Sequence, residues 1–323
     1  MKRVLVTGAS GFIGRQLCAT LRTFDHQVVG LARSVAEARR SGGVTLERIE
    51  DIARVTDWAR LVSGFDVVIH LAARAHRVGR SEARQIEEFR RVNVTPTLRL
   101  FRACSGVGVR RFVLISSIGV HGIRSEGQPI SETDRVNPQE PYARSKWEAE
   151  GGIRALAASS RSEIVIVRPA LVYGPGAKGN FYRLMQLVSS GYPLPFAGIK
   201  ARRNYLGLQN LCMLLERCAF DARAAGQTFV AADPWSVELP TLLELLARPM
   251  GRKIRLWRVA PTILTAIGTL TGRAAEVSRL TSSLEVDSAK AMSLLDWSPK
   301  VSLESEVGNM VACFMNDQVR GND

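Results

Sequence analysis

Residues 4–14 constrain the fold more than any other segment of the chain. An apolar run, Val4-Leu5-Val6, leads into glycines at positions 8, 11 and 14, and an amphipathic segment begins at residue 12. This order predicts a strand, a tight turn and a helix, because glycine lets the backbone turn sharply and approach other groups closely. The helix dipole and the first helical N–H groups favour an anion at that turn. The segment therefore predicts a βα unit that binds phosphate.

Strand and helix patterns alternate over the first half of the chain. Apolar runs bounded by turn residues predict strands at 3–7, 28–32, 67–71, 111–116 and 163–168. Segments with helical periodicity lie between them, at 12–23, 85–103 and 141–158. This alternation predicts an α/β fold with a doubly wound parallel sheet, a Rossmann domain that binds a dinucleotide.

The pattern changes near residue 170. Glycine and proline punctuate the chain, no regular strand pattern follows, and helices are expected at 181–189, 210–218, 241–246, 261–270 and 288–295. We therefore predict a dinucleotide-binding domain over residues 1–169. Residues 170–323 would form a smaller, mostly helical and mainly substrate-binding lobe, from which some segments can return to the first domain.

The charge balance indicates an anionic partner. The chain has 323 residues, 46% of them hydrophobic, which excludes a disordered or disulfide-stapled protein. Its 44 Lys and Arg exceed its 30 Asp and Glu, for a net charge of +14. Nucleic acid, anionic lipid and phosphate-bearing small molecules all fit such a charge. The arginines are dispersed and no aromatic-basic platform or zinc module accompanies them, so nucleic acid is not expected.

Targeting and metal-binding signals are not found in the sequence. Gly8 interrupts the first apolar run too early for a signal peptide, and no apolar stretch is long enough to span a bilayer. The closest approach, residues 259–270, is expected to be a buried or interfacial helix. The five cysteines form no C-x-x-C pair. We therefore expect a cytoplasmic protein with no bound metal and no membrane partner.

The end of the second predicted strand bears on the cofactor. A site that prefers NAD places an acid there to bind the ribose hydroxyls, whereas this chain has Arg33 and Ser34 and no acid before Glu37. A guanidinium suits a 2′-phosphate, so NADP is expected in preference to NAD. Asp51 and Ile52 lie where a side chain could contact the adenine.

Tyr142 and Lys146 form a candidate acid–base pair. Residues four apart on a helix project from the same face. A phenol has an ordinary pKa near 10, and a nearby ammonium lowers it, so Lys146 would tune Tyr142 as the proton donor or acceptor. Ser117 follows the strand predicted at 111–116, at the sheet edge where ligands bind, and could hydrogen-bond the reacting oxygen.

These residues occur in a combination that resembles the extended short-chain dehydrogenase/reductase family, in particular its NAD(P)-dependent nucleotide-sugar epimerase/dehydratase branch. The matching segments, in order, are residues 7–14, Asp51-Ile52, 70–73, Asn93-Val94, Ser116-Ser117, 142–146, Arg168-Pro169 and 172–176. The pattern at 287–290 and 295–299 is similar to that branch's closing helix.

The resemblance implies roles for individual residues. Ser117, Tyr142 and Lys146 would be catalytic. The implied cofactor-binding residues are Gly8, Ser10, Gly11, Phe12, Ile13, Gly14, Arg33, Asp51, Ile52, Leu71, Ala72, Ala73, Asn93, Tyr142, Lys146 and Pro169. Ser117, His121, Asn180 and Arg203 would contact the substrate, with Asn180 and Arg203 on its diphosphate. A homodimer is also expected.

The reaction can be narrowed by two positions after Ser117. Dehydratases of this family carry acids there, and the related decarboxylases also carry one, whereas this chain has Ile118 and Gly119. Neither can move a proton, so oxidoreduction or epimerisation at sugar C4 remains. Residues 145–150, 176–181 and 201–203 resemble a subgroup that handles UDP-linked acetamido sugars for surface polysaccharides. Arg33 favours its NADPH-dependent 4-reductases over its 4-epimerases.

Other interpretations stay open at this point. A UDP-glucose or UDP-N-acetylglucosamine 4-epimerase with tightly bound NAD is the first alternative. A non-catalytic, cofactor-sensing relative is the second, although such relatives often lose the Tyr or the Lys. A ketoreductase for flavonoid- or steroid-type substrates shares the fold and Arg33, but its apolar substrate would not need Arg203.

Overall fold

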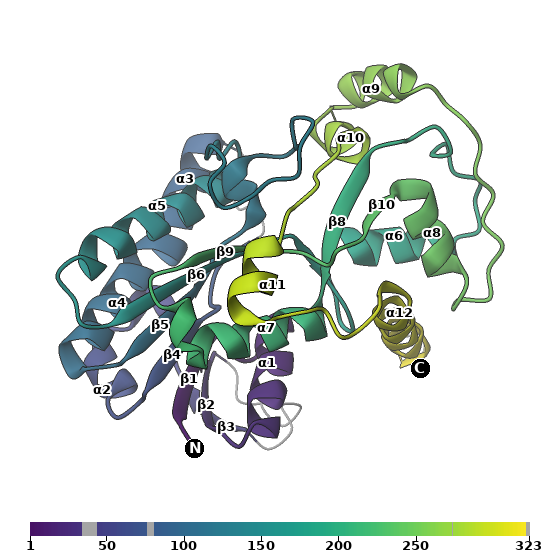
Figure 1. The fold of residues 1–323 in the computed structure, drawn as a ribbon. Helices are drawn as coiled ribbons and strands as arrows, with labels where there is room; N and C mark the ends of the chain where they lie inside the picture. Colours follow the sequence, from purple (N-terminus) through teal and green to yellow (C-terminus); the bar gives the residue numbers. More distant parts are fainter. Residues whose placement is uncertain (34–43, 76–80, 273, 321–323) are drawn as a thin grey trace.

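Seven parallel strands form the central sheet of the computed structural model, which describes residues 1–33, 44–75, 81–272 and 274–320. The strand order is β3-β2-β1-β4-β5-β6-β9, so the direction of winding reverses between β1 and β4. Figure 1 shows this sheet with helices on both faces. The strands are β1 (Arg3–Thr7), β2 (Gln27–Ala32), β3 (Thr45–Arg48), β4 (Val67–His70), β5 (Arg111–Ile115), β6 (Glu163–Pro169) and β9 (Thr228–Ala231).

Two apolar cores cover the two faces of this sheet, because successive strand residues point to opposite faces. Val4 and Val6 of β1 pack in the core with α1 and α7, whereas Leu5 packs in the core with α2, α4 and α5. The sheet is therefore buried on both sides, as a parallel sheet requires. These helices are α1 (Phe12–Thr23), α2 (Trp58–Val62), α4 (Thr95–Val107), α5 (Pro141–Ala157) and α7 (Leu208–Phe220), and α3 (Glu82–Phe89) precedes α4.

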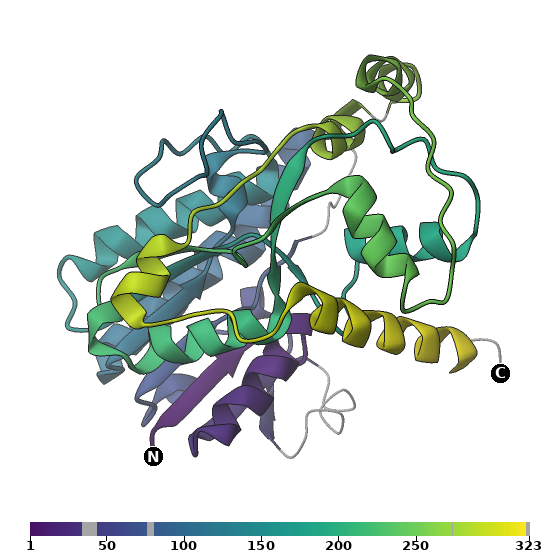
Figure 2. The same ribbon diagram turned by 45° about the vertical axis from the view of Figure 1, so that its right-hand side comes forward.

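The second part of the molecule has its own small sheet and core. Strand β8 (Arg202–Gly207) pairs antiparallel with β10 (Ser236–Glu238) and parallel with β7 (Leu171–Tyr173). Helices α6 (Asn180–Ser189), α8 (Leu239–Ala247) and α12 (Leu303–Arg320) bury apolar side chains against it. The remaining helices are α9 (Pro261–Leu270), α10 (Ala274–Thr281) and α11 (Ala289–Leu295). In Figure 2, α9 stands at the edge of this part, far from the central sheet. None of the helices in the described ranges has the length and apolar character to cross a bilayer.

The predicted α/β class is confirmed, with differences in detail. The single helix expected at 85–103 is two helices, α3 and α4, separated by a wide helical turn at Arg90–Val94. Four strands follow residue 170, where the sequence showed none, and they are only three to six residues long. One of them, β9, pairs with β6 in the main sheet. The division at residues 169 and 170 stays a prediction.

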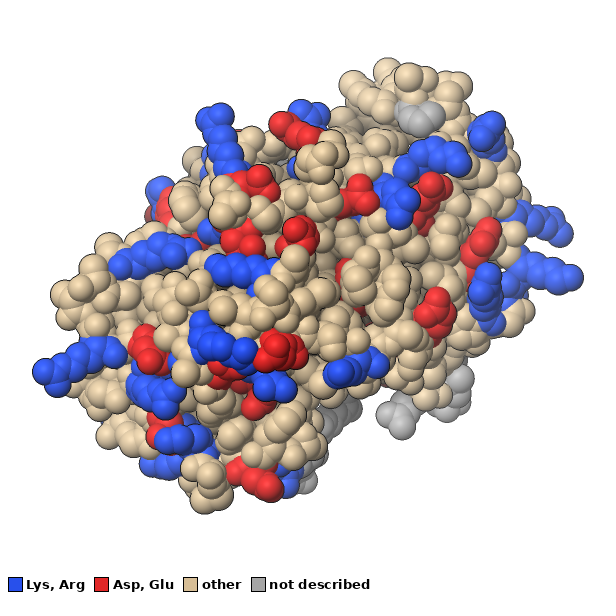
Figure 3. All heavy atoms as spheres, in the orientation of Figure 1, with Lys and Arg blue, Asp and Glu red and all other residues tan. Residues whose placement is uncertain are grey.

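Charged side chains are spread over the face of the molecule in Figure 3. Lys and Arg occur over both parts of this face with Asp and Glu among them, and they do not gather into one continuous patch. The uppermost region of the view, over α9, is instead uncharged where it is described.

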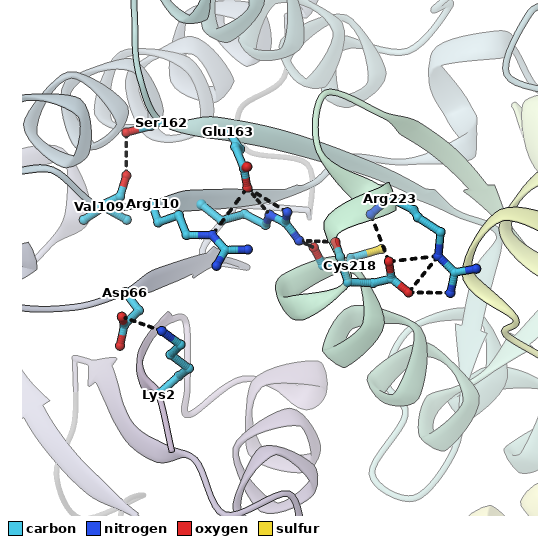
Figure 4. Close-up of polar contacts among 10 residues, drawn as sticks. Lys2, Asp66, Val109, Arg110, Ser162, Glu163, Cys218 and Arg223 are labelled. Carbon is cyan, nitrogen blue, oxygen red and sulfur yellow. Dashed lines mark hydrogen bonds and ion pairs between the residues drawn. The ribbon is translucent and has the colours of Figure 1, made fainter.

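A buried arginine joins the amino end of β5 to the second half of the chain. Arg111 is fully buried, and its Nε and Nη2 donate to Oε2 of Glu163 at 2.9 and 2.7 Å. Its Nη1 donates to the backbone carbonyls of Cys218 and Asp221, at and just beyond the end of α7. Figure 4 shows this contact beside Arg110, which approaches the same carboxylate from the surface. Arg111 therefore fixes α7 against the sheet.

We predict that Arg111→Gln lowers the free energy of unfolding by about 3 kcal/mol, because it removes the donor of the buried Cys218 carbonyl and the partly buried Asp221 carbonyl, and the closest cation of Glu163. Arg110→Gln is the matched control, since Arg110 is exposed and lies 3.7 Å from the same Glu163, and it should change stability by less than about 0.5 kcal/mol. Urea unfolding followed by circular dichroism measures both. Equal effects of the two substitutions would contradict the structural role of Arg111.

Candidate active site

The turn between β1 and α1 leaves no room for side chains at its glycines. Gly8 has a φ of +71°, and a Cβ there would lie 2.9 Å from the backbone nitrogen of Ala72 after β4. A Cβ on Gly14 would lie 2.2 Å from the carbonyl oxygen of Gly8. The first glycine therefore permits the approach of β4, and the last lets α1 pack on the turn. This arrangement fits a phosphate group of a bound dinucleotide.

A cleft of about 430 Å³ opens at the carboxyl ends of β1, β2 and β4. It lies where the winding of the sheet reverses, which is the general ligand site of open α/β sheets. The predicted cofactor residues that line it are Gly8, Ser10, Gly11, Arg33, Asp51, Ile52, Leu71, Ala72 and Ala73.

The other predicted cofactor residues lie around this cleft without lining it. Phe12, Ile13 and Gly14 form the first turn of α1, where Phe12 and Ile13 pack against the apolar core. Pro169 is buried at the end of β6. Asn93, Tyr142 and Lys146 belong to the helices beside β4 and β5.

Arg33 and Asp51 differ in whether their side chains already contact other groups of the protein. Arg33 is exposed at the cleft and makes no hydrogen bond or ion pair with any other described residue. Asp51 accepts a hydrogen bond from the backbone nitrogen of Ala53 at 3.0 Å and lies 3.6 Å from Nη1 of Arg91. Arg33 is thus available for an anion, whereas Asp51 already caps a turn. Ser34 and Glu37 lie outside the described residues.

A buried histidine connects the glycine turn to the helices behind it. Thr97 donates its hydroxyl proton to the carbonyl of Asn93 at 2.7 Å, so it must accept from Nε2 of His70 at 2.8 Å. Nδ1 of His70 then accepts from the Thr7 hydroxyl at 2.7 Å. The Thr7 hydroxyl in turn accepts from the backbone nitrogen of Ala72. Burial and the charge of Lys146 lower the pKa of His70 to about 3, so the ring is neutral.

Asn93 carries this connection to the Tyr142 helix. It is 2% exposed and lies in the wide turn at Arg90–Val94. Its Oδ1 accepts from the backbone nitrogen of Arg74, which lines the cleft, and its Nδ2 donates to Oγ of Ser145 at 3.0 Å. The Ser145 hydroxyl donates to the carbonyl of Tyr142. Asn93 therefore sets the position of α5 relative to the cleft.

The three predicted catalytic residues meet at the end of β5. Lys146 is 3% exposed, and its ammonium donates to the carbonyl of Ile115, the last residue of that strand, at 2.8 Å. It also lies 6.0 Å from the centre of the Tyr142 ring. Ser117 begins the next turn, where its Oγ accepts from the backbone nitrogen of Gly119. A Cβ on Gly119 would lie 3.5 Å from that of Ala143, so this turn packs on α5 beside Tyr142.

Burial shifts both titratable groups of the pair away from their charged forms. It raises the pKa of Tyr142 to about 12, so the prediction that the Lys146 ammonium lowers this pKa is wrong: burial of the phenol outweighs the nearby charge. Burial also lowers the pKa of Lys146 to about 8, although the carboxylate of Glu150 opposes that shift. At neutral pH the phenol is therefore protonated and the ammonium is largely charged. The pair is poised to donate a proton from Tyr142, with a positive charge nearby to stabilise the phenolate that remains.

The predicted substrate residues are more widely spread. His121 is buried, and its Nε2 accepts from Nη1 of Arg168 at 2.8 Å. Burial and the Arg168 charge lower the pKa of His121, so it is neutral. Asn180 is exposed at the start of α6.

Arg203 lies on β8 and is held by its own part of the molecule. Its Nη1 donates to the carbonyls of Arg279 and Ser282, at and just beyond the end of α10. The structure does not bring Arg203 and Asn180 into contact with each other or with His121.

Several residues of this site were not among the predicted site residues. Thr7, His70 and Thr97 form the buried chain, and Arg74, Ala75 and Val92 line the cleft. His70 opens a motif that the sequence did show, so its burial could have been anticipated. Nothing in the sequence pairs Thr97 with it. In the described ranges, no group of three or more His, Cys, Asp and Glu side chains is placed to hold a metal ion.

Comparisons with known proteins place these features in context. Residues 4–212 match the family described as NAD dependent epimerase/dehydratase. A UDP-glucose 4-epimerase of Vibrio cholerae is 35% identical over 97% of this chain and 96% of its own length. An N-acetyl-alpha-D-glucosaminyl-diphospho-ditrans,octacis-undecaprenol 4-epimerase of Escherichia coli O157:H7 is 26% identical over 78% of this chain and 73% of its own.

Solved structures share the fold. A UDP-glucuronic acid 4-epimerase from Bacillus cereus, in complex with NAD, superposes with a TM-score of 0.80 at 22% identity, over 97% of this chain and 99% of that one. MoeE5 in complex with UDP-glucose and NAD gives a TM-score of 0.77 at 24% identity, over 98% of this chain and 99% of its own.

We predict that Gly14→Ala weakens dinucleotide binding at least tenfold, because its Cβ would meet the carbonyl of Gly8 and displace the phosphate-binding turn. Gly151→Ala is the matched control, since Gly151 also lies within a helix and its Cβ would meet no atom within 4 Å. Isothermal titration with NAD and with NADP measures both variants. Equal affinity in the two would refute the close-packing argument.

We also predict that kcat/KM falls as the pH rises through about 8. Lys146 is protonated below that pH, since burial brings its pKa down to about 8, and it loses its charge above it. Lys146→Arg should abolish this fall, because arginine stays charged. A pH–rate profile from pH 6 to about 10 measures the effect. A wild-type profile that stays flat through pH 9 would argue against a charge requirement at Lys146.

Proposed function

The chain belongs to the NAD-dependent epimerase/dehydratase family, and on that premise we propose that it is a 4-epimerase of a UDP-linked sugar. The observation that carries the proposal is the placement of Tyr142 and Lys146 at the end of β5, beside Ser117 and the dinucleotide cleft. The full-length similarity to a UDP-glucose 4-epimerase supports C4 as the reacting carbon. The nucleotide-sugar class was expected from the sequence, with the 4-epimerase as its alternative.

In the proposed reaction, this chain's residues move one proton and hold one oxygen. Tyr142 accepts the proton of the C4 hydroxyl in its phenolate form, which is the minor form at neutral pH because its pKa is raised. As the phenol it returns the proton to the C4 oxygen after the keto sugar has rotated to present its other face. The Lys146 ammonium lies near enough to stabilise the phenolate. Ser117 Oγ hydrogen-bonds the same sugar oxygen and fixes it toward Tyr142. A dinucleotide held by the glycine turn at Gly8–Gly14 and the cleft beside it would supply the hydride acceptor and donor for C4.

The turn after Ser117 argues against water elimination. Elimination needs an acid and a base near the reacting carbon, and the two positions are Ile118 and Gly119. Ile118 is 5% exposed and packs in the core. A Cβ on Gly119 would already lie 3.3 Å from Ser117 Oγ, so a carboxylate side chain there would crowd the hydroxyl. The site therefore supports oxidation and reduction at C4. Positions 118 and 119 provide no group that could remove a proton from C5, as elimination would require.

Arg203 and Asn180 are the residues we propose for the diphosphate of the substrate. Arg203 keeps Nη1 on two carbonyls, and no described residue accepts from its Nε or Nη2. A diphosphate is the bidentate acceptor that suits those two donors. Asn180 is exposed at the amino end of α6, where the dipole of the helix favours an anion.

An NADPH-dependent 4-keto reductase is the second candidate, and Arg33 is the observation that favours it. Arg33 lies free at the cleft, where a 2′-phosphate would be recognised. A protonated Tyr142 also suits reduction, because the phenol donates its proton to the C4 oxygen. Arg33→Asp should then shift cofactor preference from NADP to NAD, whereas equal use of the two cofactors by the wild type would remove this argument. A homodimer in the cytoplasm remains our expectation for either function.

The two functions are separated by one set of incubations. The protein is supplied with UDP-glucose, with UDP-N-acetylglucosamine, and with NADPH and a UDP-4-keto-6-deoxy acetamido sugar. Isomer interconversion without net redox means an epimerase, and NADPH consumption with the keto sugar means a reductase. If no incubation gives isomer interconversion or NADPH consumption, both proposals are contradicted.

Under either function, Tyr142→Phe should lower kcat by about a hundredfold or more, because it removes the group that transfers the proton. Its affinity for the dinucleotide should stay within about threefold of wild type, since the cleft is unchanged. Turnover assays and titration with NAD and NADP measure the two effects. A variant that retains full turnover would show that Tyr142 is not the acid–base group.

A further inference from the structure

Helix α9 exposes an apolar face to solvent. Its ten residues carry no charge, and Ile263, Ile267 and Leu270 are 53, 51 and 87% exposed. These three positions are spaced by four and three residues, so they lie on one side of the helix. A helix this apolar is ordinarily covered by other parts of its protein. The face of α9 is not covered by the described part of this chain.

The opposite side of α9 holds the helix to the molecule. Leu264 is partly buried and, with Leu280 of α10, packs against the core of the second part. Both ribbon views place α9 beside α10, at the margin of the molecule and away from the central sheet. The apolar face of α9 therefore points away from the molecule, while the opposite side of the helix packs against it.

Basic side chains precede this face without compensating acids. Residues 245–275 contain six Lys and Arg and no Asp or Glu. Four exposed cations come just before α9, namely Arg252, Lys253, Arg255 and Arg258, and none has a side-chain hydrogen bond or ion pair with another described residue. Trp257 lies among them and is 55% exposed. The surface thus combines an uncharged apolar helix, an exposed indole and positive charge that no described side chain pairs with.

The segment that bears these cations is fixed in position. Leu194 accepts from the backbone nitrogen of Trp257 at 3.0 Å and donates to the carbonyl of Arg255 at 2.8 Å. Tyr192, two residues earlier, is 74% exposed, and Lys200 beyond this pairing is exposed as well. An exposed aromatic side chain and a further exposed cation therefore lie on the segment that pairs with residues 255–257.

We propose that α9 and the basic segment 252–258 form a docking surface for an anionic phospholipid bilayer. In this arrangement α9 lies in the plane of the interface, with Ile263, Ile267 and Leu270 among the acyl chains and the cations on the headgroups. Trp257 and Tyr192 are the amphipathic rings that such an interface favours. The sequence expectation of no membrane partner rested on the lack of a spanning segment, which surface binding does not need.

Charge complementarity favours lipid over a second copy of the chain. In a two-fold contact through this face, each copy would set its own unpaired cations near those of the other, with no acid in the segment to balance them. An anionic bilayer supplies both the negative charge and an apolar layer for α9. The anionic-lipid option that the net charge of +14 raised is thus met by one defined surface.

The test is co-sedimentation of the full chain with vesicles. Vesicles of phosphatidylcholine and phosphatidylglycerol, at about three to one, should bind the wild type at about 0.1 M salt, and vesicles of phosphatidylcholine alone should not. Ile263→Gln, Ile267→Gln and Leu270→Gln together should weaken binding about a hundredfold or more. Arg252, Lys253, Arg255 and Arg258 all replaced by Gln should weaken it on the order of fivefold per cation.

Matched controls test whether vesicle binding depends on this surface or on exposed apolar residues and positive charge in general. Val107, Leu171 and Met315 are exposed apolar residues on other elements, and Arg84, Arg99, Arg102 and Arg161 are exposed arginines elsewhere. The Gln variant of the apolar set should bind the mixed vesicles within about twofold of wild type. The Gln variant of the arginine set should bind them more tightly than the variant in which the four cations of segment 252–258 are replaced. Thermal melts followed by circular dichroism check that every variant is folded.

Three results would overturn the proposal. The first is equal binding to neutral and anionic vesicles. The second is undiminished binding by the folded Ile263, Ile267 and Leu270 variant. The third is that, without vesicles, this variant sediments as a monomer whereas the wild type sediments as a dimer. That result would make α9 a contact between copies of the chain.

Discussion

The site depends on one buried chain of hydrogen bonds. It runs from the glycine turn at Thr7, through His70 and Thr97, to Asn93 and on to Ser145 beside Tyr142. Each proton in the chain has one acceptor, so the tautomer of His70 follows from its partners. The dinucleotide cleft and the acid–base pair are on different elements, and this chain sets the distance between them. Burial and the charge of Lys146 keep His70 neutral. A charged ring would carry a proton on Nδ1, where the Thr7 hydroxyl now donates, and would disrupt that order.

The two cations of the site differ in their exposure, because Lys146 is buried whereas Arg33 lies at the open edge of the cleft. Lys146 is held at Ile115 with its charge partly disfavoured, so its pKa lies close to the physiological range. Arg33, by contrast, lies exposed at the rim of the cleft and can serve an incoming anion. The net charge of the chain cannot distinguish these two roles. Arg111, fully buried and paired, and the cations before α9 show two further uses of the same residue types.

Much of the fold could be predicted from sequence, and its limits have physical causes. The strand 3–7 and the helices 12–23 and 261–270 have the predicted bounds, since glycine, proline and a clean apolar period mark them. The wide turn at Arg90–Val94 was missed because the apolar period runs through it unchanged. The strands after residue 170 were missed because each is short and its pairing is non-local. Helix α12 was also missed, although Leu303, Val307 and Met310 carry the helical spacing.

The candidate site divides in the same way. The glycine turn, Arg33, Tyr142 and Lys146 could be found because spacing within one segment identifies them. The partners of Arg203 and His121 could not, because Arg279, Ser282 and Arg168 are brought to them only by the folded chain. Arg33 favours NADP, whereas the two structural neighbours named above were solved with NAD.

The central claim is that Tyr142 and Lys146 serve oxidation and reduction at C4 without exchange of its carbon-bound hydrogen. It is tested most directly by giving the enzyme a UDP-sugar deuterated at C4 and analysing the product by mass spectrometry and NMR. The account predicts a C4 epimer that retains the deuterium, because the hydrogen leaves and returns without reaching water. Replacement of the deuterium by solvent hydrogen during epimerisation would contradict it, since the carbon would then have been deprotonated.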